Sequence, residues 1–201
     1  MPPHEINYRA NVWALRSVGV STVVAVAAVG GITATIPGTI VLADQVIDYT
    51  YGREHTFSGH LGEPVTHVDF THPYCARVRQ VLFETASRLD MPVRPAGTLA
   101  VTQGPRLESA AEVDRLDRDG CDVVGMTGMP EAALARELGL CYAVVTLVVN
   151  AAAGRGPGTI TMAEIAHTLE TGMGRVVNLV AASLPRLTHA PCPDHTPRAV
   201  P

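Results

Sequence analysis

The stretch that decides the fold is TLAVTQGPRLE at residues 98–108, followed after a short helical run by DVVGMTGMPE at residues 122–131. In each segment an aliphatic run predicts a buried strand, and a glycine or a Gly-Pro pair interrupts it. Glu108 lies just past the first strand end, and Met126 and Thr127 follow the second in the same way. Because open α/β sheets bind ligands beyond their strand ends, both segments are candidates for a binding site.

Outward from these segments, strands and helices alternate along the chain. The pattern predicts strands at 21–29, 39–42, 98–101, 122–125 and 143–149, and helices at 6–18, 74–89, 109–116, 130–138 and 161–184. This order is typical of the α/β class, and we expect one domain over residues 1–187 with a mixed central sheet flanked by helices. The polar segment 44–73 is expected to be a long irregular loop, and the proline-rich tail 188–201 to be disordered.

Two helices carry more detailed predictions. Ser109 and Glu112 have the spacing of a capping box at the start of the helix at 109–116. Gly172 and Gly174 are expected to loosen the final helix, because glycine disfavours helical backbone.

Composition narrows the class of protein. The chain has 201 residues, of which 47% are hydrophobic but only 4% aromatic, so the core must be aliphatic, as suits a sheet covered on both faces. A formal net charge of -4 argues against a nucleic-acid partner, and no apolar run reaches the ~20 residues that span a bilayer. The first residues lack the features of a secretory signal, and the four cysteines are far apart, so we expect a cytoplasmic protein with buried reduced thiols.

Neither a metal site nor a P-loop is expected. The histidines at 55, 60, 67 and 72 fit no compact ligand set, and no nearby cysteine completes one. The glycine-rich loop at 154–158 lacks the Lys and the Ser or Thr that a P-loop requires.

The two opening segments resemble the purine-binding and phosphate-binding segments of the purine nucleoside phosphorylase family, in particular its branch that cleaves 5′-methylthio nucleosides. The match runs from about residue 2 to about residue 184, and NYRAN at 7–11, IDYT at 47–50 and MPEA at 129–132 are its most specific parts. The resemblance implies phosphorolysis of a purine nucleoside, with phosphate as co-substrate and no cofactor, by a homotrimer.

The resemblance gives Glu108, Asn150 and Ala152 a role in reading the base. In the family, the position of Asn150 carries Asn for a 6-oxopurine and Asp for adenine, which makes the Asn150 amide the catalytic donor to N7 or O6 of the purine. Methylthioadenosine enzymes carry a second Asp where this chain has Ala152. Glu108 would accept from the protonated ring nitrogen of a 6-oxopurine. The alternative is that Asn150 is a turn residue and Glu108 a helix-start carboxylate.

The remaining substrate contacts are also implied by the resemblance. Leu107 stands where many relatives carry a phenylalanine that packs on the base, and Met126 is expected under the ribose and base. The other positions around the nucleoside are Val29 and Gly30, and those around the phosphate are Ala27, Ala28 and Thr127.

The start of the final helix is expected to read the 5′ substituent. Met162 replaces the histidine that bonds a 5′-hydroxyl in the family, and Ile165 follows on the same face. An apolar wall accepts a methylthio group by burial and leaves a hydroxyl unpaired. The alternative is that Met162 and Ile165 only pack the helix on the sheet. His67 aligns with a residue that approaches the 5′ end in a neighbouring subunit's site.

The family pattern also includes an N-terminal Gly-Gly-Thr-Gly loop and an Arg-His-Gly segment, both of which bind phosphate and neither of which the sequence contains. We therefore expect an N-terminally truncated domain with an uncovered sheet edge and apolar surface. Two function classes remain. One is an active enzyme that converts a 5′-methylthio 6-oxopurine nucleoside to hypoxanthine and 5-methylthioribose 1-phosphate in purine salvage, with methylthioadenosine or general purine nucleosides as alternatives. The other is a non-catalytic nucleoside-binding or oligomer-forming remnant.

Overall fold

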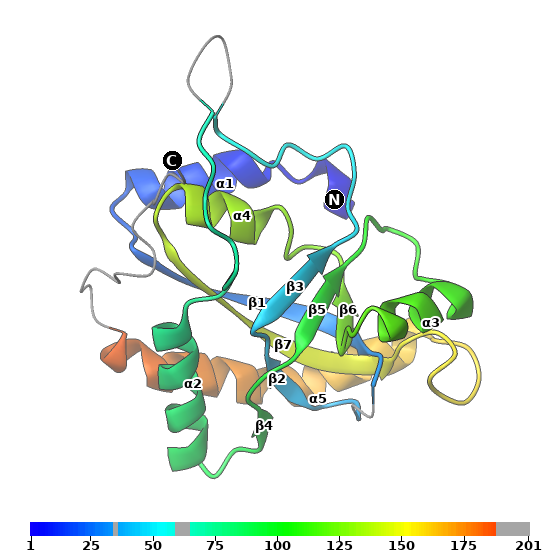
Figure 1. The fold of residues 1–201 in the computed structure, drawn as a ribbon. Coiled ribbons are helices and arrows are strands. Elements are labelled where there is room, and N and C mark those ends of the chain that lie inside the picture. The colour runs from blue at the N-terminus through cyan, green and yellow to red at the C-terminus, as the bar shows by residue number, and fades with distance from the viewer. Residues whose placement is uncertain (34–35, 59–64, 188–201) are drawn as a thin grey trace.

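The computed structural model describes residues 1–33, 36–58 and 65–187, and Figure 1 shows how their elements are arranged around a central sheet. The strands are β1 (Thr22–Gly31), β2 (Ile40–Leu42), β3 (Gln45–Asp48), β4 (Val93–Arg94), β5 (Thr98–Val101), β6 (Val123–Gly125) and β7 (Cys141–Ala151). The helices are α1 (Tyr8–Ser17), α2 (Ala76–Arg88), α3 (Ala110–Arg118), α4 (Glu131–Glu137) and α5 (Met162–Ser183), with 3-10 turns at Pro3–Glu5 and Leu184–Arg186.

The sheet is mixed, as the sequence predicts. Its strand order is β3-β5-β6-β1-β7-β2-β4. The pairs β1–β7, β2–β4, β3–β5 and β5–β6 are parallel, whereas β1–β6 and β2–β7 are antiparallel. The long pair β1–β7 has a register shift between Val29 and Gly30, which brings Gly30 opposite Asn150.

Alternate side chains of the sheet enter different cores. In β7, Tyr142, Val144 and Val148 pack in the core that also holds residues of α1 and α4. Their neighbours Ala143, Val145 and Leu147 pack with α2 and α5 on the opposite face. Figure 1 shows α1 and α4 together on one side of the sheet and α2 and α5 on the other. Both faces of β7 are therefore buried, which explains its continuous aliphatic run.

The predicted capping box at α3 is confirmed. The Ser109 side chain accepts from the backbone N–H of Glu112, and the Glu112 side chain accepts in return from the backbone N–H of Ser109. The pair satisfies backbone donors that have no partner inside the helix, so it fixes where α3 begins.

The prediction that glycines loosen the final helix is wrong. Helix α5 is continuous from Met162 to Ser183, and Gly172 is buried in it. A Cβ at Gly172 would lie 2.9 Å from Cδ2 of Leu147, so the absence of a side chain lets α5 approach β7 closely.

The prediction of an irregular loop over residues 44–73 is wrong in one part. Residues Gln45–Asp48 form β3, an edge strand parallel to β5. Strand β7 also extends to Ala151, further than the sequence indicates, and the sequence does not predict the two-residue strand β4. The predictions for His60 and for the tail at 188–201 lie outside the described residues.

The expected open sheet edge lies on β1. Among the described residues, β6 pairs with β1 only at Gly30 and Gly31, while β7 pairs along the whole strand. From Thr22 to Val29 the side of β1 away from β7 thus has no partner strand in the described part of the chain. Val26 on this stretch is 44% exposed, and Trp13 on α1 is 60% exposed.

The cysteine prediction is confirmed for the three cysteines that the structure describes, since Cys75, Cys121 and Cys141 are buried thiols. Within the described ranges, every helix is too short or too polar to cross a membrane.

Candidate functional site

A cavity of about 380 Å³ lies where β1, β6 and β7 end and α5 begins. It collects most of the residues that the sequence analysis assigns to the site. From that set, the lining holds Ala27, Ala28, Val29, Gly30, Leu107, Glu108, Met126, Thr127, Asn150, Ala152 and Ile165. The segments at 98–108 and 122–131 thus meet in space, together with the end of β7.

Three strands converge on the cavity at Gly30. Gly30 pairs with Val124 of β6 on one side and with Asn150 of β7 on the other. The turn after β6 then carries Met126 and Thr127 to the same place, and both line the cavity. A binding site at strand ends where neighbouring strands change direction is the usual arrangement in open α/β sheets.

Asn150 is half-buried in the cavity wall. Its Nδ2 donates to the carbonyl oxygen of Ala151 at 2.7 Å, which orients the amide. Because an amide nitrogen carries two hydrogens, the second N–H and the side-chain oxygen are left for a ligand. Ala152 is 3% exposed and adds no polar group next to Asn150.

Glu108 is held by the turn that follows β5. The Thr102 hydroxyl donates to Oε1 of Glu108 at 2.6 Å, and the Thr102 backbone N–H donates to the carbonyl of Gly125 at 2.9 Å. Gly104 within this turn has φ of 60°, and a Cβ there would lie 2.5 Å from Sδ of Met126. A glycine is therefore required for the turn to pack against Met126.

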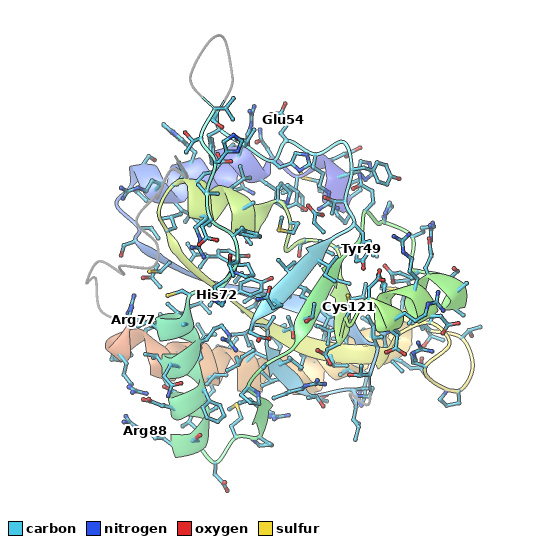
Figure 2. All side chains as sticks on the ribbon, in the orientation of Figure 1. Tyr49, Glu54, His72, Arg77, Arg88 and Cys121 are labelled. Atoms are coloured by element: carbon cyan, nitrogen blue, oxygen red, sulfur yellow. The ribbon has the colours of Figure 1, made fainter. Side chains whose placement is uncertain are left out.

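Glu108 also borders a second cavity of about 250 Å³ on the α3 side. Tyr49 lines this second cavity, and its hydroxyl donates to Oδ2 of Asp119 at 2.7 Å, with Cys121 close by (Figure 2). Desolvation by burial, followed by the hydrogen bond to Asp119, raises the pKa of Tyr49. The Glu108 carboxylate thus forms part of the wall between two cavities.

Two predicted site residues do not line the first cavity. Met162 begins α5 and is 74% exposed, whereas Ile165, one turn further along the same face, lines it. His67 is exposed on the segment after residue 64. Within the described residues, no three His, Cys, Asp or Glu side chains lie close enough to hold a metal ion.

The lining of the first cavity has no basic side chain among the residues that the structure describes. Its polar atoms come from Glu108, Thr127, Asn150 and the backbone. An anion in this cavity would therefore depend on N–H and O–H donors of the described residues.

The comparison with known families agrees with this geometry. Residues 1–185 match the Phosphorylase superfamily. The chain belongs to this superfamily. Its match covers nearly all the described residues and includes every residue that lines the first cavity.

Several curated proteins are similar to this chain in sequence. A "Probable S-methyl-5'-thioinosine phosphorylase" from Pseudomonas syringae pv. tomato is 51% identical, with 92% of this chain and 75% of that protein covered. One of the same name from Xylella fastidiosa is 53% identical, with 90% and 74% covered. The "6-oxopurine nucleoside phosphorylase" of Pyrococcus furiosus is 45% identical, with 92% and 72% covered.

Solved structures of the superfamily show the same fold. A double mutant of the adenosine/methylthioadenosine phosphorylase from Schistosoma mansoni, in complex with adenine, matches with a TM-score of 0.89 at 29% identity. The match covers 92% of this chain and 73% of that one. The nucleoside phosphorylase fold predicted from the sequence is therefore confirmed.

The sequence analysis did not identify Arg53, a buried side chain that joins the turn after β5 to the turn after β6. Arg53 is 5% exposed. Its guanidinium donates to the carbonyls of Thr102 and Gln103 after β5 and to those of Met126 and Met129 after β6. Because these partners are backbone carbonyls, which every residue has, the sequence does not indicate which residues a single arginine in a polar segment would contact.

The sequence analysis also did not identify Glu131, a half-buried acid at the start of α4. Tyr142 donates its hydroxyl hydrogen to Oε1 of Glu131 at 2.7 Å, and its ring stacks on Tyr74 with centroids 6.1 Å apart. Burial raises the pKa of Glu131, although the hydrogen bond from Tyr142 opposes this. Because Glu131 begins α4 directly after the Met129–Pro130 turn and Tyr142 belongs to β7, this hydrogen bond joins the start of α4 to β7.

Proposed function

We propose that this chain phosphorolyses a 6-oxopurine nucleoside that carries a 5′-methylthio group. For S-methyl-5′-thioinosine the products are hypoxanthine and 5-methylthioribose 1-phosphate, which fits a role in purine salvage. The observation that carries the proposal is the meeting of Glu108 and Asn150 at one cavity formed by strand ends. The names of the relatives from Pseudomonas syringae and Xylella fastidiosa support the same substrate.

The reaction exchanges one bond for another at the anomeric carbon. A phosphate oxygen forms a bond to C1′ while the C1′–N9 bond breaks, and the electron pair of that bond moves into the purine. A proton then neutralises the departing base. Hydrogen bonds that strengthen as the purine becomes negative lower the barrier, because they stabilise the transition state more than the substrate.

Glu108 and Asn150 are suited to a 6-oxopurine. Such a base carries a hydrogen on N1, which a carboxylate oxygen of Glu108 can accept, and an O6 and N7 to which the Asn150 amide can donate. Adenine has no hydrogen on N1 and would present a lone pair to the Glu108 carboxylate. Ala152 supplies no acid that could protonate adenine, so the set favours hypoxanthine over adenine.

Apolar and backbone groups complete the proposed nucleoside site. Leu107 and Met126 provide apolar surface for the base and ribose, next to Val29 and Gly30 of β1. For phosphate we assign the Thr127 hydroxyl and the backbone N–H groups of Ala28 and Thr127, with Ala27 next to them on β1.

The 5′-methylthio group is assigned to the start of α5. Ile165 contributes apolar surface to the cavity, and Met162 lies one turn before it. A methylthio group gains from burial against such side chains, whereas a 5′-hydroxyl would lose its hydrogen bonds to water without replacement. In the proposed homotrimer, His67 would reach the 5′ end of the nucleoside in a neighbouring subunit, so its exposure in a single chain is consistent with the proposal.

The test compares four nucleosides under identical conditions with inorganic phosphate. Methylthioinosine should have the highest kcat/KM, ahead of inosine, methylthioadenosine and adenosine. Equal kcat/KM values for methylthioinosine and inosine would show that Met162 and Ile165 do not select the 5′ substituent. A preference for methylthioadenosine would remove the proposed role of Glu108 and Asn150.

A second candidate function is nucleoside binding without phosphorolysis. The observation that favours it is the lack of a basic side chain among the described lining residues. In that case hypoxanthine nucleosides would bind in a calorimetric titration, yet no base would be released when phosphate is added. Release of hypoxanthine that depends on phosphate would exclude this candidate.

A further inference from the structure

The Thr102 hydroxyl donates a hydrogen bond to the Glu108 carboxylate. Oγ1 of Thr102 lies 2.6 Å from Oε1 of Glu108, a short distance of the kind formed when a hydroxyl donates to an ionised acceptor. The described residues form no hydrogen bond with Oε2 of Glu108. One carboxylate oxygen is thus occupied by the protein, and the other is available to a ligand.

Thr102 itself is held firmly. Its backbone N–H donates to the carbonyl of Gly125 at 2.9 Å, and its carbonyl accepts from Nη2 of Arg53 at 3.3 Å. Both sides of the Thr102 peptide backbone are therefore bonded to other parts of the site. The hydroxyl points at Glu108 from a fixed position, so it can orient a carboxylate six residues further along the chain.

The Glu108 side chain could also turn toward the second cavity, because Glu108 borders both cavities. Thr102 lines this cavity and not the first one, whereas Glu108 lines both. Arg106 lines the second cavity too, and its pKa is raised chiefly by the hydrogen bonds to Glu112 and to a smaller extent by the nearby charge of Glu108. Without the Thr102 hydroxyl, this positive charge would draw the Glu108 carboxylate away from the first cavity.

We propose that Thr102 is a positioning residue that sets base selectivity, because its hydroxyl holds Oε1 of Glu108 and so keeps Oε2 as the acceptor for the N1–H of a 6-oxopurine. The inference rests on the proposed role of Glu108 in binding the base. Thr102 touches no substrate atom in this account. It acts by keeping the carboxylate in the wall of the nucleoside cavity.

The experiment measures the dissociation constants of hypoxanthine and adenine by calorimetry, with inorganic phosphate present, so that no turnover is required. T102V removes the donor with little change in volume, T102A carries the same expectation if T102V does not fold, and T102S keeps the hydroxyl. Thr85 offers a matched control, since it is 3% exposed in α2 and its hydroxyl donates to the Val81 carbonyl at 2.7 Å. E108Q reports on the proposed base-binding role itself.

We expect T102V to lower the preference for hypoxanthine over adenine by about tenfold, as the loss of one oriented hydrogen bond predicts. T102S and T85V should keep the preference of the unmodified chain. An unchanged preference in T102V, or a loss in T102S as large as in T102V, would overturn the role of Thr102. If E108Q also leaves the preference unchanged, the proposed role of Glu108 fails as well, whereas a change in E108Q alone limits the failure to Thr102.

Discussion

Nη1 of Arg53 lies 2.6 Å from the carbonyl oxygen of Met129, and Nη2 of the same guanidinium lies 2.9 Å from the carbonyl of Gln103. One buried side chain therefore joins the turn after β6 to the turn after β5. These turns carry Met126 and Glu108, both of which line the first cavity. The separation of the two walls depends on Arg53, although Arg53 itself does not line that cavity.

Replacement of Arg53 by methionine should damage both stability and binding. Several buried carbonyls would lose their donor, so the free energy of unfolding should fall by about 3 kcal/mol in urea denaturation. The turns would also lose their fixed separation, and the affinity for hypoxanthine should fall even where the variant is fully folded.

Arg136 provides the matched control for Arg53. It is 8% exposed, donates to the backbone carbonyl of His72, and does not line the first cavity. Arg136→Met should lower stability while leaving the affinity for hypoxanthine of the folded protein unchanged. Equal losses of affinity in both variants would show that Arg53 has no special role in the site.

Asn150→Asp should shift the base preference toward adenine. The change replaces a donor to O6 or N7 with a carboxylate that repels O6, and an unsuitable polar contact of this kind costs about 1–3 kcal/mol. The ratio of kcat/KM for methylthioinosine to that for methylthioadenosine should therefore fall by roughly tenfold or more. If the ratio stays constant, Asn150 does not read the base.

Glu131→Gln should change how stability depends on pH. Burial raises the pKa of Glu131 above its usual 4.5, so the folded state favours the protonated carboxyl. The unmodified chain should therefore lose stability relative to the variant as the pH rises above about 4.5 through the raised pKa. The side-chain oxygen of the introduced glutamine can still accept from the Tyr142 hydroxyl. Urea denaturation between about pH 4 and about pH 8 measures the difference, and a difference that is constant or grows in the opposite direction would contradict the assignment.

Two glycines of α5 should respond in opposite ways to alanine. No atom lies within 4 Å of the position that a Cβ would take at Gly174, so Gly174→Ala should stabilise the helix by about 0.5–1 kcal/mol. At Gly172 the new Cβ would lie 2.9 Å from Cδ2 and 3.1 Å from Cδ1 of Leu147, and we expect a loss of about 1 kcal/mol. Thermal unfolding of the two variants tests this, and equal stabilisation would mean that α5 does not pack closely on β7.

The sequence predicted the α/β class and the strands that end at the first cavity, because buried parallel strands leave long aliphatic runs and the turns after them carry glycine. It did not predict β3 or β4. Gln45–Asp48 is only four residues long and carries polar residues at both ends, as an edge strand can, and β4 has only two residues. Short edge strands are specified by the neighbour they pair with more than by their own sequence.

The sequence predicted the residues that line the candidate site, but not the residues that hold them in place. Glu108 and Asn150 follow recognisable strands, so their places could be inferred. The contacts of Arg53 and Thr102 depend on how distant turns fold against one another. The Thr102 hydroxyl reaches Glu108 only because the chain reverses at Gly104, where a glycine with positive φ packs on Met126.

The most direct test of the proposed function is the release of hypoxanthine from S-methyl-5′-thioinosine with and without inorganic phosphate. Chromatography quantifies the base, and mass spectrometry quantifies the pentose phosphate. We expect release to require phosphate and each hypoxanthine to be accompanied by one 5-methylthioribose 1-phosphate. Absence of release, or release at the same rate without phosphate, would contradict the proposed function.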